Sequence, residues 1–144
     1  MNTRTMIAIV ALWGLASAAK AGDVSVLGFW HTLKDGKPRS VVEVYLQNGK
    51  LHGRVNKFYL SPGEAEPICT DCTGQRQDQP VRGMEILSGF QPSGDKWIGG
   101  RVFSPVRNQA FDGELWLEGE TLKLKASWGF ISRTQTWHRA HFSE

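Results

Sequence analysis

The feature that most constrains the fold is a series of short runs in which apolar and polar residues alternate, with turn residues between the runs. In the clearest run, Val42, Val44 and Leu46 alternate with polar neighbours. A period of two places alternate side chains on opposite faces of a β-strand. Asn48 and Gly49 follow directly, and both tolerate the positive φ of a tight hairpin turn. The pattern therefore predicts antiparallel strands joined by hairpins.

About eight strands of this kind can be placed along the chain. They cover residues 29–33, 40–47, 50–60, 84–90, 97–103, 110–117, 121–127 and 134–142. Gly99 and Gly100 interrupt one strand, which indicates a sharp bend or bulge of the kind that barrel corners need. No long helix is predicted after residue 21. Consecutive hairpin-linked strands predict a small, all-β, up-and-down barrel, and a β-sandwich is the structural alternative because the strand spacing serves both.

The two ends of the strand region carry matching motifs. Gly28 and Trp30 share one face of the first strand, and Trp137 and Arg139 share one face of the last. A tryptophan that plugs one barrel end, with a guanidinium stacked on its indole, would close the barrel, and Gly28 would allow the backbone to cross closely. Arg139 or Arg133 could supply the guanidinium. We favour this closure over the alternative, in which Trp30 contacts a ligand, because aromatic side chains of this kind usually serve packing.

The first 21 residues have the features of a secretory signal peptide. Arg4 supplies a positive charge, residues 6–16 are mostly apolar, and Ala19 to Ala21 offer a small-residue cleavage site. The alternative is an uncleaved anchor helix, but the apolar run is short for a membrane span. We therefore expect residues 1–21 to be removed, residues 22–144 to form a single barrel domain, and the protein to be periplasmic or secreted.

The charge balance excludes some classes of partner. The chain has 17 Lys and Arg against 14 Asp and Glu, and the loss of Arg4 and Lys20 with the signal leaves 15 against 14. The remaining charges are scattered, with no basic stripe to follow a nucleic-acid backbone. Nucleic acid is therefore not an expected partner, and no strong preference for acidic substrates is expected.

Cys69 and Cys72 lie in a long polar segment, residues 61–80, which also holds three prolines. In an exported protein this spacing favours a short disulfide that stiffens the loop. A thiol–disulfide oxidoreductase is an alternative, but its reactive cysteine sits at a helix N-terminus, which this segment does not offer. A zinc site is a further alternative and needs about four ligands. The available histidines show no ligand-like spacing to the pair; they are His31, His52, His138 and His141.

No convergent catalytic group is visible. Glu43 and Glu85 each sit between apolar residues on a strand, where a lone carboxylate is usually solvated. The serines at 104, 127 and 132 lack the context of an activated nucleophile. Phosphate-binding loops and dinucleotide motifs are absent. We therefore expect no enzyme activity, no cofactor and no bound metal.

With these residues in view, the chain resembles the domain of unknown function 2147 family of exported bacterial proteins. The similarity extends from residue 28 to residue 140. It rests on residues 28–30, 36–45, 48–53, 69–72, 79–84, 97–100 and 129–139. The resemblance implies a lipocalin-like or calycin-like barrel with no established molecular activity. The chain departs from the family at Ser104, where an aspartate is usual, at Ala110 and Phe111, where a tyrosine is usual, and at Ser127 and Trp128, which replace a Gly-Tyr pair.

Three functions stay open at this point. The first is binding of a small apolar or amphipathic ligand in a cavity, without catalysis, at a mouth shaped by residues 61–80. Its inner wall, from alternation, would include Val42, Val44, Leu46, Leu115, Leu117, Leu122 and Leu124. The second is a cavity-free scaffold that binds another envelope protein through the cysteine loop and surface tryptophans such as Trp116. The third is an oxidoreductase that uses Cys69 and Cys72.

Overall fold

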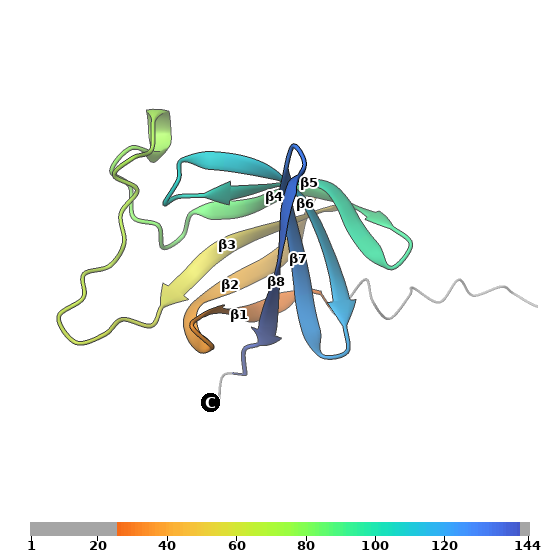
Figure 1. Ribbon diagram of the computed structural model, residues 1–144, viewed down its shortest axis with the longest axis horizontal. Coiled ribbons are helices and arrows are strands. Elements are labelled where there is room, and N and C mark those ends of the chain that lie inside the picture. Colours follow the sequence, from red (N-terminus) through yellow and green to blue (C-terminus); the bar gives the residue numbers. More distant parts are fainter. Residues whose placement is uncertain (1–25, 142–144) are drawn as a thin grey trace, which may run out of the picture.

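The computed structural model describes residues 26–141. Eight antiparallel strands close into one barrel in sequential order (Figure 1). They are β1 (Gly28–Lys34), β2 (Lys37–Gln47), β3 (Lys50–Phe58), β4 (Glu85–Ser93), β5 (Lys96–Ser104), β6 (Gln109–Glu118), β7 (Thr121–Trp128) and β8 (Ile131–Arg139). The predicted up-and-down barrel is confirmed. The sandwich alternative is wrong because β8 pairs with β1 and closes the sheet. The predicted signal segment, residues 1–21, lies outside the described residues.

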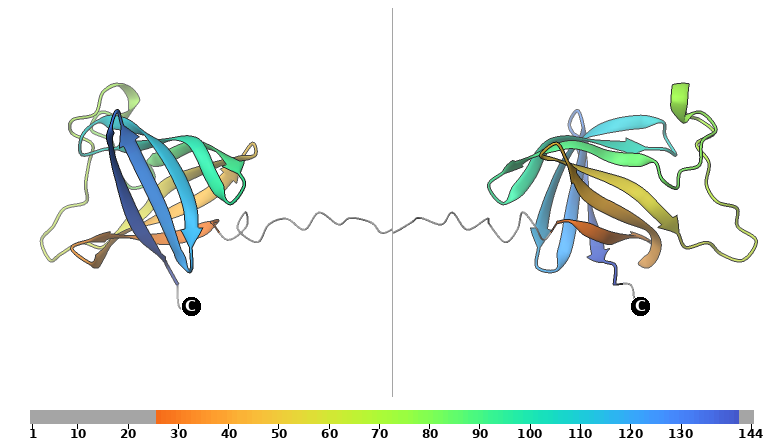
Figure 2. Two further views of the ribbon diagram at one scale, coloured as in Figure 1. Left: turned by 45° about the vertical axis from the view of Figure 1, so that its right-hand side comes forward. Right: turned by 180° about the vertical axis from the view of Figure 1, so that it is seen from behind.

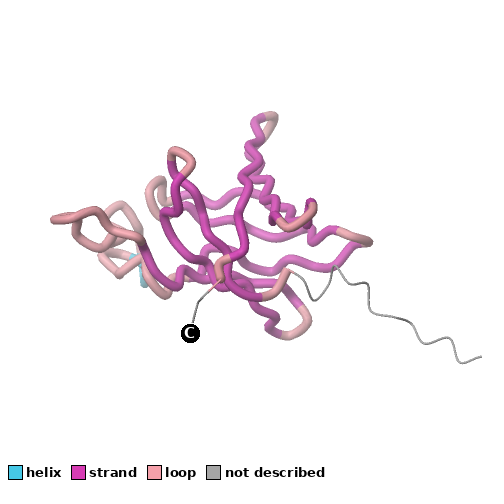
Figure 3. The backbone as a smooth tube through the Cα atoms, turned by 90° about the horizontal axis from the view of Figure 1, so that it is seen from below, coloured by secondary structure: helices cyan, strands magenta, loops and turns pink. Residues whose placement is uncertain are grey.

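Tight turns set the register of the hairpins. Asn48 and Gly49 have φ values of 53° and 74°, as the predicted turn between β2 and β3 requires. Asp35 and Gly36 repeat this geometry between β1 and β2, with φ values of 52° and 75°. Strands and the loops that join them make up almost the whole described chain, and the one short helical turn in residues 26–141, η1 (Gly74–Arg76), lies in the long β3–β4 connection (Figure 3).

A bulge bends β5 at the predicted glycine pair. Gly99 has a φ of 69°, and the pairing of β5 with β6 shifts register between Trp97 and Gly100. An extra residue of this kind increases the local twist, which a small closed barrel needs. The predicted bend at Gly99 and Gly100 is therefore present.

The last strand begins three residues earlier than predicted. β7 and β8 turn at Gly129 and Phe130, and pairing starts at Trp128 with Ile131. Residues 131–135 are all exposed, although they lie in a paired strand. Their inner face meets open space instead of a packed core, so the apolar alternation that identifies a half-buried strand is missing here.

Two apolar clusters divide the interior. The larger cluster fills the end of the barrel around Trp30, Phe90 and Leu115. The smaller cluster lies near the end of β3 and packs Val55 against Cys69 and Cys72. The β3–β4 connection, drawn yellow to green, stands at one side of the barrel (Figure 2).

Candidate ligand-binding cavity

One end of the barrel is closed by Trp30. Its indole is fully buried, and its Nε1 donates a hydrogen bond of 2.9 Å to the carbonyl oxygen of Val26. The Arg139 guanidinium lies over the ring, with Cζ 3.9 Å from the ring centroid, and its Nη1 donates to the Leu27 carbonyl at 2.7 Å. Gly28 has a φ of 115°, a conformation that favours glycine, and a Cβ there would also lie 3.1 Å from this Nη1. The structure thus places Arg139, and not Arg133, on the tryptophan.

The Arg139 side chain is partly removed from water by this arrangement, and the loss of solvation lowers the pKa of its guanidinium. Arginine has so high an ordinary pKa that it stays charged all the same. The stacked indole and the carbonyl of Leu27 therefore hold a permanent cation across the closed end.

Most residues predicted for the inner wall fill the core between the closed end at Trp30 and the cavity. Val42, Val44, Leu115 and Leu122 are buried in the larger cluster, and Leu117 packs against it. They point inward as alternation requires, but they pack against one another and do not line open space. Among the predicted wall residues, Leu124 lines the cavity.

Leu46 corrects the prediction for the inner wall. Its side chain is 48 % exposed, although alternation assigns it to the same face as Val42 and Val44. Leu46 is the second-last residue of β2, next to the Asn48–Gly49 turn. Its partner across the β2–β3 hairpin, Leu51, is fully buried in the larger cluster, so Leu51 fills the core at this height and Leu46 lies at its edge.

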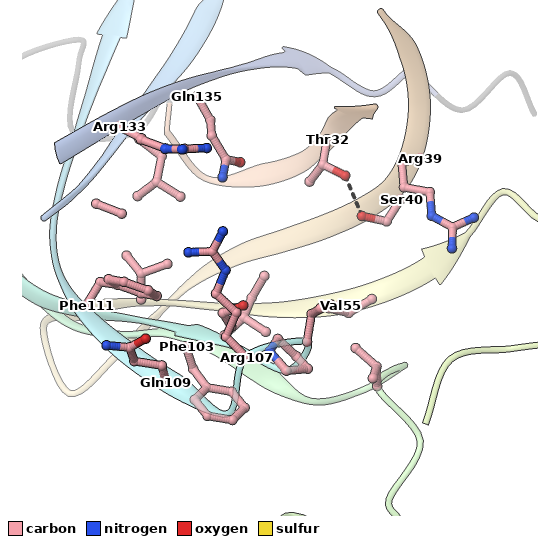
Figure 4. A pocket seen from close by; sticks show the side chains of 18 of the residues that line it. Thr32, Arg39, Ser40, Val55, Phe103, Arg107, Gln109, Phe111, Arg133 and Gln135 are labelled. Carbon is pink, nitrogen blue, oxygen red and sulfur yellow. Dashed lines mark hydrogen bonds between the residues drawn. The ribbon is translucent and has the colours of Figure 1, made fainter. Parts of the chain in front are cut away.

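The opposite end of the barrel is open and holds a cavity of about 810 Å³. Volumes of about 300–1,000 Å³ are typical of sites for small molecules. The wall comes from the strands and from the β5–β6 turn, with Pro67 and Val81 from the β3–β4 connection (Figure 4). The expectation that the 61–80 segment shapes the mouth is met by Pro67. The interior of the barrel is therefore not filled throughout by its own side chains.

The lower wall of the cavity is apolar and aromatic. Trp137 is almost fully buried, and its Nε1 donates to Gln135 Oε1 at 3.0 Å, so its polar atom is satisfied. It belongs both to the packed core and to the cavity floor. Phe111 on β6 lines the cavity (Figure 4), whereas the Phe103 ring lies on the other face of the β5–β6 pair, beside the cysteine cluster and beneath the Arg76 guanidinium. Such a surface favours an apolar ligand group.

The rim of the cavity is polar. Thr32 Oγ1 and Ser40 Oγ form a hydrogen bond of 2.6 Å across β1 and β2. Arg39 forms an ion pair with Glu64 at 2.5 Å, and the hydrogen bond between them lowers the pKa of the Glu64 carboxyl. Arg107 extends from the β5–β6 turn into the cavity (Figure 4). An apolar floor below a polar rim can hold an amphipathic molecule in one orientation.

The cysteine pair is joined as a disulfide, in agreement with the prediction. Its Cα atoms are 5.3 Å apart, and both side chains are buried beside Val55 and Val81. Cys69 Sγ lies 3.4 Å from the carbonyl oxygen of Pro105, in the turn after β5. No α-helix begins at either cysteine within residues 26–141. The disulfide therefore anchors the loop against the side of the cavity mouth.

The outer face of β2, β3 and β4 carries a separate polar cluster. His52 Nδ1 lies 2.7 Å from Glu85 Oε1, and the Arg54 guanidinium pairs with Glu43 while covering the Tyr45 ring. Burial is the main cause that raises the pKa of the Tyr45 hydroxyl. Of the two carboxylates predicted to be solvated, Glu43 is thus paired with a guanidinium and Glu85 with an imidazole, both on the outside of the barrel.

The histidines do not form a metal site in the described part of the chain. Within residues 26–141 no group of three or more His, Cys, Asp or Glu side chains is placed to hold a metal ion. Burial, together with the charges of Lys57, His138 and His141, lowers the pKa of His31.

Within residues 26–141, no helix is long and apolar enough to cross a membrane.

Sequence reasoning missed the residues that give the cavity its character. Arg107 lies in a turn, and Gln135 lies on a strand with no apolar alternation. Phe111 was assigned to a strand, but nothing in its spacing separates a cavity wall from a packed core. The available signal was the unbroken polar run of residues 132–136, which leaves polar side chains on both faces of this strand.

A closed eight-stranded barrel with a cavity at one end defines the lipocalin class of fold. A solved structure of protein HP1028 from Helicobacter pylori, described as belonging to the lipocalin family, is similar with a TM-score of 0.67 and 18 % sequence identity, over 80 % of this chain and 82 % of that one. The chain itself belongs to the family described as uncharacterized protein conserved in bacteria (DUF2147), whose sequence profile matches residues 28–139. No curated protein matches its sequence.

Proposed function

We propose that the protein binds one small apolar or amphipathic molecule in the open-end cavity, without catalysis. The observation that carries the proposal is a cavity of about 810 Å³ with an aromatic floor beneath a polar rim. The fold supports it, because eight-stranded barrels are just wide enough to hold one small ligand. The closed end does not compete as a site, since Trp30 and Arg139 satisfy each other there.

Filling the cavity tests this function. Ala126 lies on β7 and lines the cavity, so Ala126→Trp places an indole in the ligand space. We expect the variant to bind the neutral fluorescent probe N-phenylnaphthylamine at least about tenfold more weakly than the unmodified protein, since a single methylene in a hydrophobic pocket already changes selectivity by that factor or more. Titration of probe fluorescence measures the affinity.

The matched control is Lys125→Trp, which adds the same side chain at the neighbouring position on the outer face of β7. It should leave probe affinity unchanged. Equal binding by the unmodified protein and by Ala126→Trp, with both variants folded by circular dichroism, would contradict a ligand site in this cavity.

The proposed location is the periplasm or the medium. Support comes from the signal-like residues 1–21 and from the Cys69–Cys72 disulfide, because such bonds persist in oxidising compartments. The intact mass of the protein recovered from cells tests this, and a species that retains residues 1–21 would contradict it. Native mass spectrometry of the same preparation also reports any copurified ligand.

A further inference from the structure

The inner face of β8 changes from apolar to cationic along its length. Arg133, Gln135 and Trp137 stand at every second position of β8, so they share the face that lines the cavity. Trp137 lies at the packed floor, and Arg133 lies nearest the β7–β8 turn at the rim. Gln135 and Arg133 are exposed although they face inward, which shows that water reaches this part of the cavity.

The charges that line the cavity are all positive. They belong to Lys34, Arg39, Arg107 and Arg133, and no Asp or Glu is among the lining residues. Arg39 is neutralised by Glu64. Among residues 26–141, neither Arg107 nor Arg133 forms an ion pair. The near-neutral composition of the predicted domain hides this local excess of positive charge.

We propose that the ligand is a single-chain amphiphile with an anionic oxygen head group, a carboxylate or a phosphate. This rests on the proposed function and adds the chemical class of the ligand. The alkyl chain lies against Phe111, Leu124 and Trp137, and the head group lies at the rim between Arg107 and Arg133.

The head group is recognised by charge and by hydrogen bonds together. Two guanidinium groups that face one cavity repel each other, and an anion between them removes this repulsion. Guanidinium donors also match the geometry of carboxylate and phosphate oxygens. Gln135 adds a donor, because its Oε1 accepts from Trp137 and leaves its Nε2 hydrogens for the ligand. Figure 4 shows Gln135, Arg133 and Arg107 around the same open space.

Ligands with one tail and different heads test the proposal. Dodecanoate, dodecyl phosphate, dodecanol and dodecylammonium would compete with N-phenylnaphthylamine at low ionic strength. We expect one or both anions to bind at least about tenfold more tightly than dodecanol, since a hydrogen bond to a charged group is worth about that factor. Dodecylammonium should bind most weakly. The stronger of the two anions identifies a fatty-acid-like or a lysophospholipid-like source of the head group.

The variant Arg107→Gln/Arg133→Gln should lose the preference for the anions and keep its affinity for dodecanol. Arg101→Gln is the matched control, because Arg101 pairs with Asp112 on the outer surface and should leave the preference unchanged. Equal binding of dodecanol and both anions to the unmodified protein would overturn the head-group proposal while leaving the proposed function standing. Failure of every ligand and of the probe to bind would overturn the proposed function itself.

Discussion

Replacing Trp30 by alanine is expected to lower the free energy of unfolding by about 3–5 kcal/mol, the range found for large aromatic side chains removed from a core. The indole is fully buried in the larger cluster, and its Nε1 holds the backbone at Val26. Its removal also uncovers the Arg139 guanidinium, which stacks on the ring. A barrel of this size has a total stability of about 5–15 kcal/mol, so the loss is a large fraction of it.

Urea denaturation followed by circular dichroism measures this effect. Trp116→Ala is the control, because Trp116 lies on the outer face of β6 with Lys96 over its ring, and its loss should cost less than about 1 kcal/mol. Trp30→Phe keeps an aromatic plug and removes the Nε1 donor, so it should fall between the two. A Trp30→Ala protein as stable as Trp116→Ala would show that the floor of the barrel does not depend on this residue.

The barrel could be predicted because its strands repeat one simple pattern. Alternation in β2, β6 and β7 reflects a packed inside and a wet outside, and turns such as Asn48–Gly49 need particular residues. The end motifs could be paired because positions two apart share a face, as Trp137 and Arg139 do. Each of these inferences depends on one strand or one turn at a time.

The cavity could not be predicted in the same way, because it depends on which positions are left unfilled. Val42 and Leu124 have the same pattern in the sequence and both are buried in the larger cluster, yet of the two only Leu124 also lines the cavity. The height of each residue along the barrel decides this, and that height follows from register and bulges. Leu46 shows the same limit at the other end, where an inward position is exposed although its cross-strand partner Leu51 is fully buried.

Gly100→Ala is expected to destabilise the barrel by about 1–3 kcal/mol, the range for overpacking a core. A Cβ at this position would lie 2.3 Å from Cγ and Cδ2 of Phe90, whose ring is fully buried on β4. The ring also lies against Gly113, so the two glycines of β5 and β6 together make room for it. At an unobstructed glycine with ordinary backbone angles, alanine would instead stabilise by about 0.4–1 kcal/mol.

A double-mutant cycle shows whether this close contact is the cause. Phe90→Leu removes ring atoms that the new Cβ would meet, so Gly100→Ala should cost less in the Phe90→Leu background than alone, with a coupling of about 0.5–3 kcal/mol. Urea midpoints of the four proteins measure the coupling. Strictly additive losses would mean that the backbone at Gly100, and not the Phe90 ring, sets the requirement for glycine. Coupling would establish that the core is packed tightly up to Phe90, which makes the open space above it a feature of the wall residues and not of a loosely packed barrel.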